Sequence, residues 1–386
     1  MSAYLDRAHS LLPRLAERVD EARTLRRLPG ATIQDLQETG ILRMLQPARW
    51  GGGECTPLAF FTVQHTLGTV SPATAWVLGV VGVHAWQLAL FDDRAQQEVW
   101  GDDPSTLISS SYAPVGKVTP VDGGFRLSGR WSFSSGSDHC QWVFVGGFAP
   151  TPQGAPPDMR TFLVPRSDYA IVDVWQTTGL QATGSNDVVI DDVFVPEHRT
   201  HRLFDGFKCD SPGNAVNPGP TYRLPFGQVF VRSVSTTAIG ILEGALGVFK
   251  ASARNKFATS DGARVMEDPH TQEVLARAST VLDEVKLVLA RDCEEQLAMA
   301  RAGDRIPLDL RVRHRFHSSR AVVRCVEQVD VLMNTSGGRA LFQDHPLNRY
   351  FQDAQAARAH YANNPAKPAR NLGWVMLGQK TRDFFL

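Results

Sequence analysis

The chain has 386 residues, of which 43% are hydrophobic, and its 40 Lys and Arg balance its 40 Asp and Glu. This length exceeds one ordinary hydrophobic core and predicts about two or three domains, while the zero formal net charge argues against nucleic acid or an anionic membrane as a partner. Five widely spaced cysteines form no CxxC pair, so neither a metal site nor a disulfide framework is expected. The first residues lack the apolar core of a signal peptide, and we expect a cytoplasmic location.

Residues 1–104 have the pattern of an N-terminal helical domain. Apolar residues recur at helical spacing, and the segment 92–103 predicts one more short helix that ends at Gly101. The segment 73–91 has no formally charged residue and is long enough to cross a bilayer, but it contains His84 and no basic cluster flanks it. We therefore expect the buried helix of a large protein and no membrane span.

The pattern changes to short strands over residues 105–209. Runs rich in Val, Ile, Phe, Thr and Trp alternate with Gly, Pro and Asp turns at the spacing of a small β barrel or sandwich, and VDGGF predicts a hairpin turn. Residues 210–220 predict a boundary loop. Long helical segments return over residues 221–386 and predict a C-terminal bundle.

The sequence contains no GxGxxG, P-loop, HExxH or GxSxG motif. It therefore offers no nicotinamide fingerprint and no common hydrolase signature. One segment, WSFSSGSDHCQW at residues 131–142, combines three aromatic side chains with several serines. This combination suits contact with a flat ligand that has polar edges, and a serine-rich turn that caps two strands is the alternative interpretation.

Four segments stand in a characteristic order: VVGVHAWQLALF, LISSSYAPVGK, GGFRLSGRWSFSSGSDHCQWVFVGG and NRYFQDAQAARAH. Together they resemble the oxygenase branch of the acyl-CoA dehydrogenase superfamily, which contains the two-component, flavin-dependent aromatic monooxygenases. The resemblance implies an acyl-CoA dehydrogenase-like fold with an N-terminal α-helical domain, a middle β-barrel or sandwich domain and a C-terminal four-helix bundle. In that fold the flavin lies between the β domain and the bundle.

The resemblance implies that residues 131–135 face the flavin. Trp131 and Phe133 would supply apolar area, and Ser134 and Ser135 would supply hydroxyl groups. By resemblance, Ser135 is the candidate to hydrogen-bond flavin N5. Such a bond would hold the N5 proton and slow the loss of peroxide from a C4a-hydroperoxyflavin.

Three residues are the catalytic candidates that the resemblance implies. His84 would face the substrate from the apolar helix, Ser110 would contact the substrate's oxygen, and His360 would face the flavin and substrate from the bundle. From the sequence alone, His84 is equally explained as a satisfied core histidine. The register of the serine run leaves Ser109 and Ser111 open, and either histidine could accept a phenolic proton.

Two further segments resemble the part of the superfamily that holds the flavin's phosphate and adenine end, often from a neighbouring subunit of a homotetramer. In RNKF the implied residues are Arg254 and Phe257. In NTSGG they are Gly337 and Gly338, where a missing Cβ lets the backbone approach a pyrophosphate. A helix C-cap is the alternative for the two glycines.

An acyl-CoA dehydrogenase needs a carboxylate base, but neither of the two segments that carry it in that family contains a glutamate here, and Glu243 lies elsewhere. We therefore expect the oxygenase component of a two-component flavin-dependent monooxygenase that uses O2 and FMNH2 or FADH2 to hydroxylate a small aromatic substrate, with a phenol as the favoured class. A separate NAD(P)H-dependent flavin reductase would supply the reduced flavin. The alternatives are an amine or sugar N-oxygenase, an acyl-CoA dehydrogenase and a non-enzymatic helical scaffold.

Overall fold

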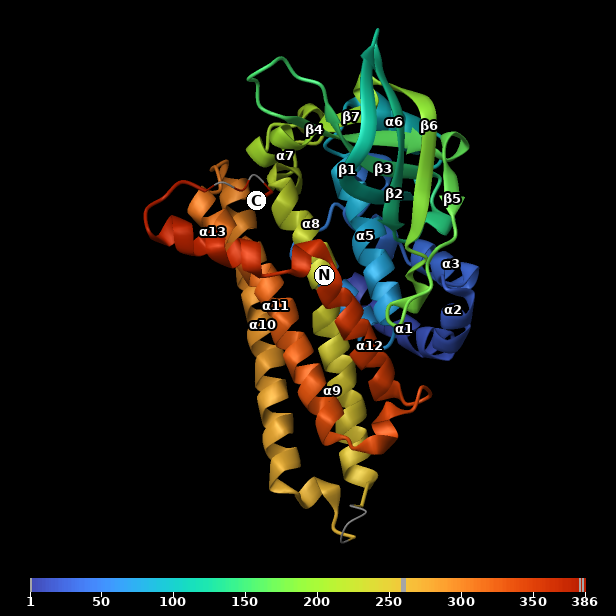
Figure 1. Cartoon of the computed structure of the whole chain (residues 1–386), viewed down its shortest axis with the longest axis vertical. Helices are drawn as coiled ribbons and strands as arrows, with labels where there is room; N and C mark the ends of the chain where they lie inside the picture. Colours follow the sequence, from blue (N-terminus) through green and yellow to red (C-terminus); the bar gives the residue numbers. More distant parts are fainter. Residues whose placement is uncertain (1, 258–261, 382, 384) are drawn as a thin grey trace.

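Helices, then strands, then helices follow one another along the chain (Figure 1). A computed structural model describes residues 2–257, 262–381, 383 and 385–386. The first helices are α1 (Ser2–Glu17), α2 (Val19–Leu25), α3 (Gly30–Glu38), α4 (Pro57–Gly68), α5 (Pro72–Leu88) and α6 (Asp93–Trp100). The helix expected within 92–103 is thus α6, and its C-cap is Gly101 as predicted.

Seven strands form one sheet of order β5-β6-β2-β1-β3-β4-β7. Their bounds are β1 (Ile108–Val121), β2 (Gly124–Ser134), β3 (Trp142–Ala149), β4 (Asp158–Pro165), β5 (Ala170–Val172), β6 (Asn186–Pro196) and β7 (Thr200–Arg202). Only the β1–β3 pair is parallel among these strands. The predicted VDGGF hairpin joins β1 to β2, and Gly123 adopts a φ of +74° that glycine tolerates without strain.

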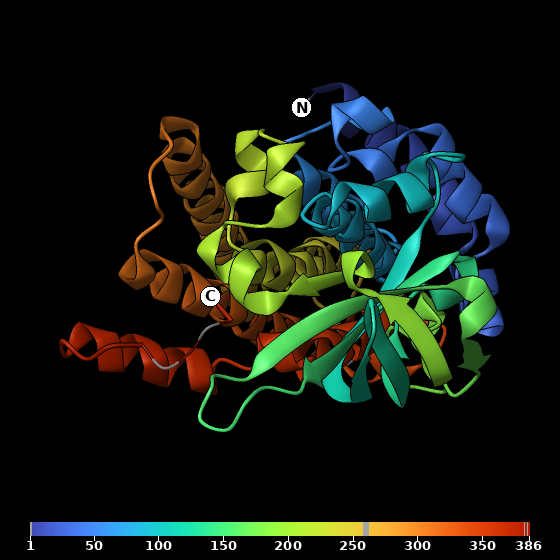
Figure 2. The same ribbon diagram turned by 90° about the horizontal axis from the view of Figure 1, so that it is seen from above.

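The C-terminal region is built from long helices. Their bounds are α7 (Leu203–Lys208), α8 (Phe226–Ser235), α9 (Thr237–Asn255), α10 (Pro269–Ala302), α11 (Leu308–Thr335), α12 (Pro346–Ala359) and α13 (Ala366–Met376). The bundle of α9 to α12 extends away from the sheet (Figure 1). Viewed from above, the strands lie on one side of the bundle, and α13 projects from another (Figure 2).

Helix α5 is the element on which the three regions meet. It packs against α4, α8, α9 and β1, and nearly all of its residues are buried, including His84. Ser71 caps its N-terminus and Pro72 occupies its first turn. Its lack of a polar face is therefore explained by contact on all sides. By length and apolarity one stretch of the described residues, Phe226–Asn255, could cross a membrane, but 94% of its apolar window is buried inside the protein.

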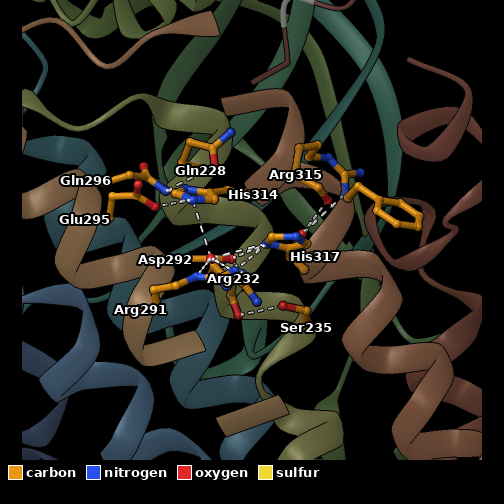
Figure 3. Close-up of polar contacts among 12 residues, drawn as sticks. Gln228, Arg232, Ser235, Arg291, Asp292, Glu295, Gln296, His314, Arg315 and His317 are labelled. Atoms are coloured by element: carbon orange, nitrogen blue, oxygen red, sulfur yellow. Dashed lines mark hydrogen bonds and ion pairs between the residues drawn. The ribbon is translucent and has the colours of Figure 1, made fainter. Parts of the chain in front are cut away.

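A polar network joins three of the bundle helices away from α5 (Figure 3). The Arg232 guanidinium of α8 forms an ion pair with Asp292 of α10, and both side chains are buried. Asp292 also accepts hydrogen bonds from Arg291 at 2.9 Å and from His317 of α11 at 3.0 Å. The network thus fixes α8, which continues toward the sheet, to α10 and α11.

Candidate active site

A compact group forms where α5 lies against β1. The Nδ1 atom of His84 lies 2.6 Å from the carbonyl oxygen of Ile108, and the ring packs edge-on against Tyr112 and Phe144, at centroid distances of 6.1 and 5.5 Å. The Tyr112 hydroxyl donates to Oε1 of Gln87, which lies one turn after His84 on α5. The helix and the strand therefore direct one histidine, one tyrosine and one glutamine toward each other.

The serine run in β1 separates by strand alternation, because residues two apart share a face. The Ser111 hydroxyl donates to the carbonyl oxygen of Ser132 at 2.6 Å and so points to the neighbouring strand β2. Ser110 instead lies on the same strand face as Tyr112, two residues further along. Ser110 is thus the serine that the fold places beside Tyr112.

A second group forms where the end of β2 meets α5 and the residue after α12. Trp76 of α5 donates from Nε1 to Ser135 Oγ at 3.1 Å, and its ring packs edge-on against His360 at a centroid distance of 5.6 Å. Ser135 Oγ also lies 2.7 Å from Ser185 Oγ. Trp76 precedes His84 by eight residues on the same helix, which corresponds to roughly 12 Å along the axis.

The backbone selects a different tautomer for each histidine. A carbonyl oxygen only accepts, so the contact to Ile108 requires a proton on Nδ1 of His84 and leaves its buried Nε2 as an unpartnered acceptor. His360 is the reverse case, because its Nδ1 accepts from the backbone N–H of Ala362 at 3.1 Å. The neutral His360 ring therefore carries its proton on Nε2. His84 offers a lone pair, whereas His360 offers an N–H.

Burial keeps both histidines neutral. Loss of hydration lowers the pKa of His84 to about 4, and the bond to Ile108 offsets only part of this effect. Burial also lowers the pKa of His360 to about 4, and the nearby Arg315 adds to the shift. Near pH 7 each ring is therefore neutral and keeps the tautomer that the backbone selects.

Trp131 belongs to the core of the β domain, and the expectation that it faces a flavin is wrong. The side chain is fully buried among strand residues, and its Nε1 donates to the carbonyl oxygen of Gly146 at 2.9 Å. A Cβ added at Gly116 or Gly129 would lie within 2.8 Å of the indole ring. The glycines of the strands thus make room for Trp131 inside the domain.

Phe133 and Ser134 end β2 in unusual ways. Phe133 has a φ of +68° and is 70% exposed, and its ring packs edge-on against Trp175 at a centroid distance of 6.2 Å. The Ser134 hydroxyl is fully buried and has no hydrogen-bond partner. An exposed aromatic ring beside an unsatisfied hydroxyl indicates a surface that a ligand completes.

The remaining cofactor candidates lie together at the far end of the bundle. Arg254 is in the last turn of α9, and exposed Phe257 follows it. Gly337 and Gly338 follow α11, and Lys256 Nζ joins the two segments by donating to the Ser336 carbonyl oxygen at 2.7 Å. This is the lower end of α9 and α11 in Figure 1, away from the sheet.

Arg349 and Asp353, two charged residues of the NRYFQDAQAARAH segment, contact different parts of the chain. Arg349 pairs with Asp20 of α2, whereas Asp353 accepts the backbone N–H of Leu180 at 2.6 Å. The sequence analysis did not single out Trp76, Tyr112 or Gln87 as site residues. Their helical and strand spacing to His84 and Ser110 is the signal that could have placed them.

The residues around Ser135 fit the reactive edge of a flavin. The N5–H of a reduced flavin donates a hydrogen bond, and Ser135 Oγ retains acceptor capacity beside Trp76. Phe133 adds exposed aromatic surface next to this hydroxyl. At the other end, a Cβ added to Gly338 would meet nothing within 4 Å, which leaves the backbone open to a phosphate. The chain's residues would therefore hold the two ends of a flavin at two separate places.

Family models match both helical regions of the chain. The acyl-CoA dehydrogenase N-terminal domain matches residues 7–103, and the acyl-CoA dehydrogenase C-terminal domain matches residues 233–365. The oxygenase subunit HsaA, a flavin-dependent monooxygenase from Mycobacterium tuberculosis, is 41% identical over 93% of this chain and 91% of its own. The oxygenase component of the FADH2-dependent resorcinol hydroxylase from Rhizobium sp. is 32% identical over 94% and 90%.

Solved structures agree with these relatives. The crystal structure of 3-HSA hydroxylase from Rhodococcus sp. RHA1 superposes with a TM-score of 0.94 at 37% identity, covering 99% of this chain and 98% of its own. XiaF from Streptomyces sp., solved with FADH2 and glycerol, gives a TM-score of 0.91 at 25% identity over 99% and 96%. With the site described above, these findings confirm the expected fold and chemistry: the chain belongs to the flavin-dependent monooxygenases of the acyl-CoA dehydrogenase fold, as an oxygenase component.

Proposed function

We propose that the chain hydroxylates a small phenolic substrate that lies between α5, β1 and α8, with His84 as the group that accepts the phenolic proton. The observation that carries this proposal is the tautomer of His84, whose buried Nε2 lone pair has no partner within the chain. Ionising the phenol raises the electron density of the ring carbon that receives oxygen. Relatives named for resorcinol and for p-hydroxyphenylacetate, both of which are phenols, support this substrate class.

His360 has the complementary role in the proposal. Its Nε2–H is a donor, and it lies beside Trp76 and Ser135 at the expected flavin edge. When bound, a reduced flavin supplies the activation of dioxygen. His360 would donate a hydrogen bond to the oxygen that remains after transfer, and Ser110 would orient the substrate's hydroxyl from β1.

Aromatic side chains supply the apolar wall of the proposed substrate site. Phe226 and Phe230 of α8 stack at 5.7 Å, and Tyr112 packs edge-on against both of them. Phe385, near the end of the chain, packs against the same two rings at 5.9 and 6.1 Å. Such a wall accommodates a flat ring and excludes water from the reacting centre.

The partners follow from the same proposal. A separate NAD(P)H-dependent reductase would deliver the reduced flavin, and the names "oxygenase subunit" and "oxygenase component" of the relatives support this division of labour. We propose a cytoplasmic homotetramer in which the phosphate-end candidates Gly337 and Gly338, which follow α11 at the end of the bundle, serve the flavin of a neighbouring chain. A neighbouring copy would bring its own bundle end to that flavin.

A carboxylate base for an acyl-CoA dehydrogenase is not favoured by the geometry. Glu243 forms an ion pair with Lys286 at 2.7 Å, and despite partial burial its contacts with His65 and Lys286 lower its pKa to about 2. Asp353 is already engaged by the Leu180 backbone. An amine or sugar N-oxygenase would use the same flavin chemistry, but it has no need of the two hydroxyl-binding groups His84 and Ser110.

The first experiment mixes the protein with reduced FAD or FMN without oxygen, adds oxygenated buffer, and records absorbance in a stopped-flow instrument. We expect a transient species before oxidised flavin appears, and a shorter lifetime of it in Ser135→Ala. A panel of phenols, aromatic amines and acyl-CoA thioesters then distinguishes the alternatives by product analysis. One-step oxidation that the protein does not change, with no hydroxylated phenol, would refute the proposal.

A further inference from the structure

A chain of hydrogen bonds runs from the Ser135 hydroxyl into the protein interior. Trp76 Nε1 donates to Ser135 Oγ at 3.1 Å, Ser135 Oγ lies 2.7 Å from Ser185 Oγ, and Ser185 Oγ lies 2.6 Å from Thr183 Oγ1. Thr183 Oγ1 in turn donates to the carbonyl oxygen of Leu180 at 3.0 Å. All four side chains are more than nine-tenths buried. Bulk water therefore has little access to these hydroxyl groups.

The groups at the two ends of this series of hydrogen bonds determine which atom donates in each bond. The indole N–H of Trp76 can only donate, and the carbonyl oxygen of Leu180 can only accept. The Thr183 hydroxyl donates its one proton to the Leu180 carbonyl oxygen, so it can only accept from Ser185. Ser185 therefore donates to Thr183 and accepts from Ser135, which donates its own proton to Ser185. The reverse order would leave two acceptor oxygens facing each other at 3.0 Å without a proton between them.

The Leu180 carbonyl is well placed to end the chain. It also accepts from Trp175 Nε1 at 2.9 Å and from the backbone N–H of Thr183 at 3.2 Å, so three donors converge on this oxygen and none of them can accept from it. On the other side of the residue, Asp353 of α12 accepts the Leu180 N–H at 2.6 Å. The acceptor that sets the direction of the chain is thus fixed by contacts to two other segments.

Ser135 consequently has no proton left for a ligand and keeps one lone pair. A reduced flavin carries hydrogen on N5 and can donate to that lone pair, whereas the N5 of an oxidised flavin is itself an acceptor. We infer that Thr183 and Ser185 are positioning residues that make Ser135 an obligate acceptor, and that this hydroxyl chain selects reduced over oxidised flavin. The inference rests on the proposed function in one respect, namely that Ser135 faces N5.

This selection suits an enzyme that takes its flavin from a separate reductase. The N5–H of reduced flavin donates a hydrogen bond to Ser135. After the reaction, the N5 atom of oxidised flavin and the Ser135 oxygen are both acceptors, so no hydrogen bond forms between them. An unpaired buried polar contact of this kind corresponds to about a ten- to hundredfold difference in affinity. The device lies in side chains that touch neither the substrate nor the flavin.

The test compares the dissociation constants of reduced and oxidised FAD, measured anaerobically by fluorescence titration, in the wild-type protein and in two variants at one position. Thr183→Val removes the hydroxyl but keeps a similar shape, so Ser185 turns its proton toward Ser135 and the Ser135 proton turns toward the flavin. We expect the preference for reduced flavin to fall at least tenfold, with tighter binding of oxidised flavin. Thr183→Ser retains the hydroxyl and should keep the wild-type preference.

Ser185→Ala provides a second variant with the same expected direction, because it also frees the Ser135 proton. If Thr183→Val and Ser185→Ala weaken both redox forms equally, the loop merely packs against the site and the inference is wrong. Equal affinity of the wild-type protein for both forms would also overturn it. If the wild-type protein binds neither form of FAD or FMN, the proposed function fails as well, which separates that failure from failure of the hydroxyl chain alone.

Discussion

Two histidines with similar pKa values acquire different chemistry from the backbone atoms that they contact. A carbonyl oxygen on Nδ1 turns His84 into an acceptor at Nε2, and a backbone N–H on Nδ1 turns His360 into a donor at Nε2. Because burial lowers the pKa of both histidines, neither ring takes up a second proton near neutral pH, and each keeps its tautomer. The division of roles therefore follows from the local fold and needs no difference in acidity.

We expect the two histidines to give distinct losses on substitution. His84→Gln should lower hydroxylation by about 10²- to 10⁴-fold, because the phenolic proton has no acceptor. Oxidation of the flavin should continue, so the yield of product per reduced flavin falls. His360→Gln retains an N–H donor and should act less on that yield. Product and oxidised flavin are quantified in single-turnover mixing, and equal yields in both variants would contradict the assignment.

The pH dependence follows from the direction of the same pKa shifts. His84 must be neutral to act, and its pKa is lowered to about 4, so kcat/KM should fall only as the pH drops toward 4 and not near the ordinary value of 6.5. An acid limb centred near pH 6.5 would show that the reacting histidine is not buried. The measurement is a kcat/KM profile from pH 4 to 8 with a buffer-matched unfolding control.

The free energy of unfolding should also change with pH, between about pH 6.5 and pH 4. Between pH 6.5 and 4 the unfolded chain binds protons that buried His84 and half-buried His360 in the folded chain do not, so stability is present above pH 6.5 and is lost as the pH falls. Melting temperatures at pH 7 and pH 5 test this expectation. His84→Gln should reduce the difference between them.

At the scale of elements, helix α5 positions both groups of the site because it crosses α4 and α8 closely. A Cβ at Gly79 would lie 2.2 Å from Gln64 Nε2 and 2.6 Å from the Ser233 carbonyl oxygen, and these two atoms already share a hydrogen bond of 2.6 Å. Gly79 is therefore required by close approach of neighbouring helices and not by its own backbone angles.

Gly79→Ala should destabilise the protein by about 1–3 kcal/mol, since overpacking must separate α5 from its neighbours. Gly247→Ala on α9 is the matched control, because an added Cβ there meets nothing within 4 Å. That change should raise stability by up to about 1 kcal/mol through helix propensity. Unfolding midpoints in urea compare the two variants, and equal effects would refute the packing argument.

The ion pair in Figure 3 gives a second test at this scale. Asp292→Leu leaves the buried Arg232 guanidinium without its carboxylate and should cost about 3–5 kcal/mol. The double variant Arg232→Met with Asp292→Leu removes both charges and should recover most of that loss. Thermal unfolding of the single and double variants measures the recovery. A double variant as unstable as the single one would show that the charge itself is needed.

Elements were more predictable from the sequence than contacts between them. Apolar periodicity and Gly or Pro stops predicted α6 and the long bundle helices, because these signals are local. The break at Thr236 between α8 and α9 was not predicted, since no Gly or Pro marks it.

The environment of Trp131 was predicted wrongly because it depends on contacts between strands. Strand alternation predicts the face on which its side chain lies, but the glycines that enclose its ring lie partly on another strand. The partners of Ser135 come from residues 50 and 59 positions away, which no single-sequence pattern links.

At the scale of the whole molecule, the two ends of the proposed flavin site lie in different regions of the fold, because α5 lies next to the sheet whereas α9 and α11 end away from it (Figure 1). Ser135 and Trp76 lie beside α5, whereas Gly337 and Gly338 lie at the far end of the bundle. If one flavin contacts both, the two ends belong to different copies of the chain. Sequence resemblance suggested this arrangement, and the position of the glycine pair after α11, at the bundle end away from the sheet, agrees with it.

Complementation between two defective variants tests this arrangement. One chain carries His84→Gln with Ser135→Ala, and a second, differently tagged chain carries Gly338→Trp, which fills the open space at the bundle end. Each alone should be inactive. Mixed assemblies purified through both tags should regain about a quarter of the wild-type activity, because each half of a shared site is intact with a probability of about one half. A control pair of two differently tagged chains that both carry His84→Gln with Ser135→Ala should show no such gain, since every site takes that half from a defective chain. Activity of the first mixture no greater than the sum of its parts would mean that each chain builds its flavin site alone.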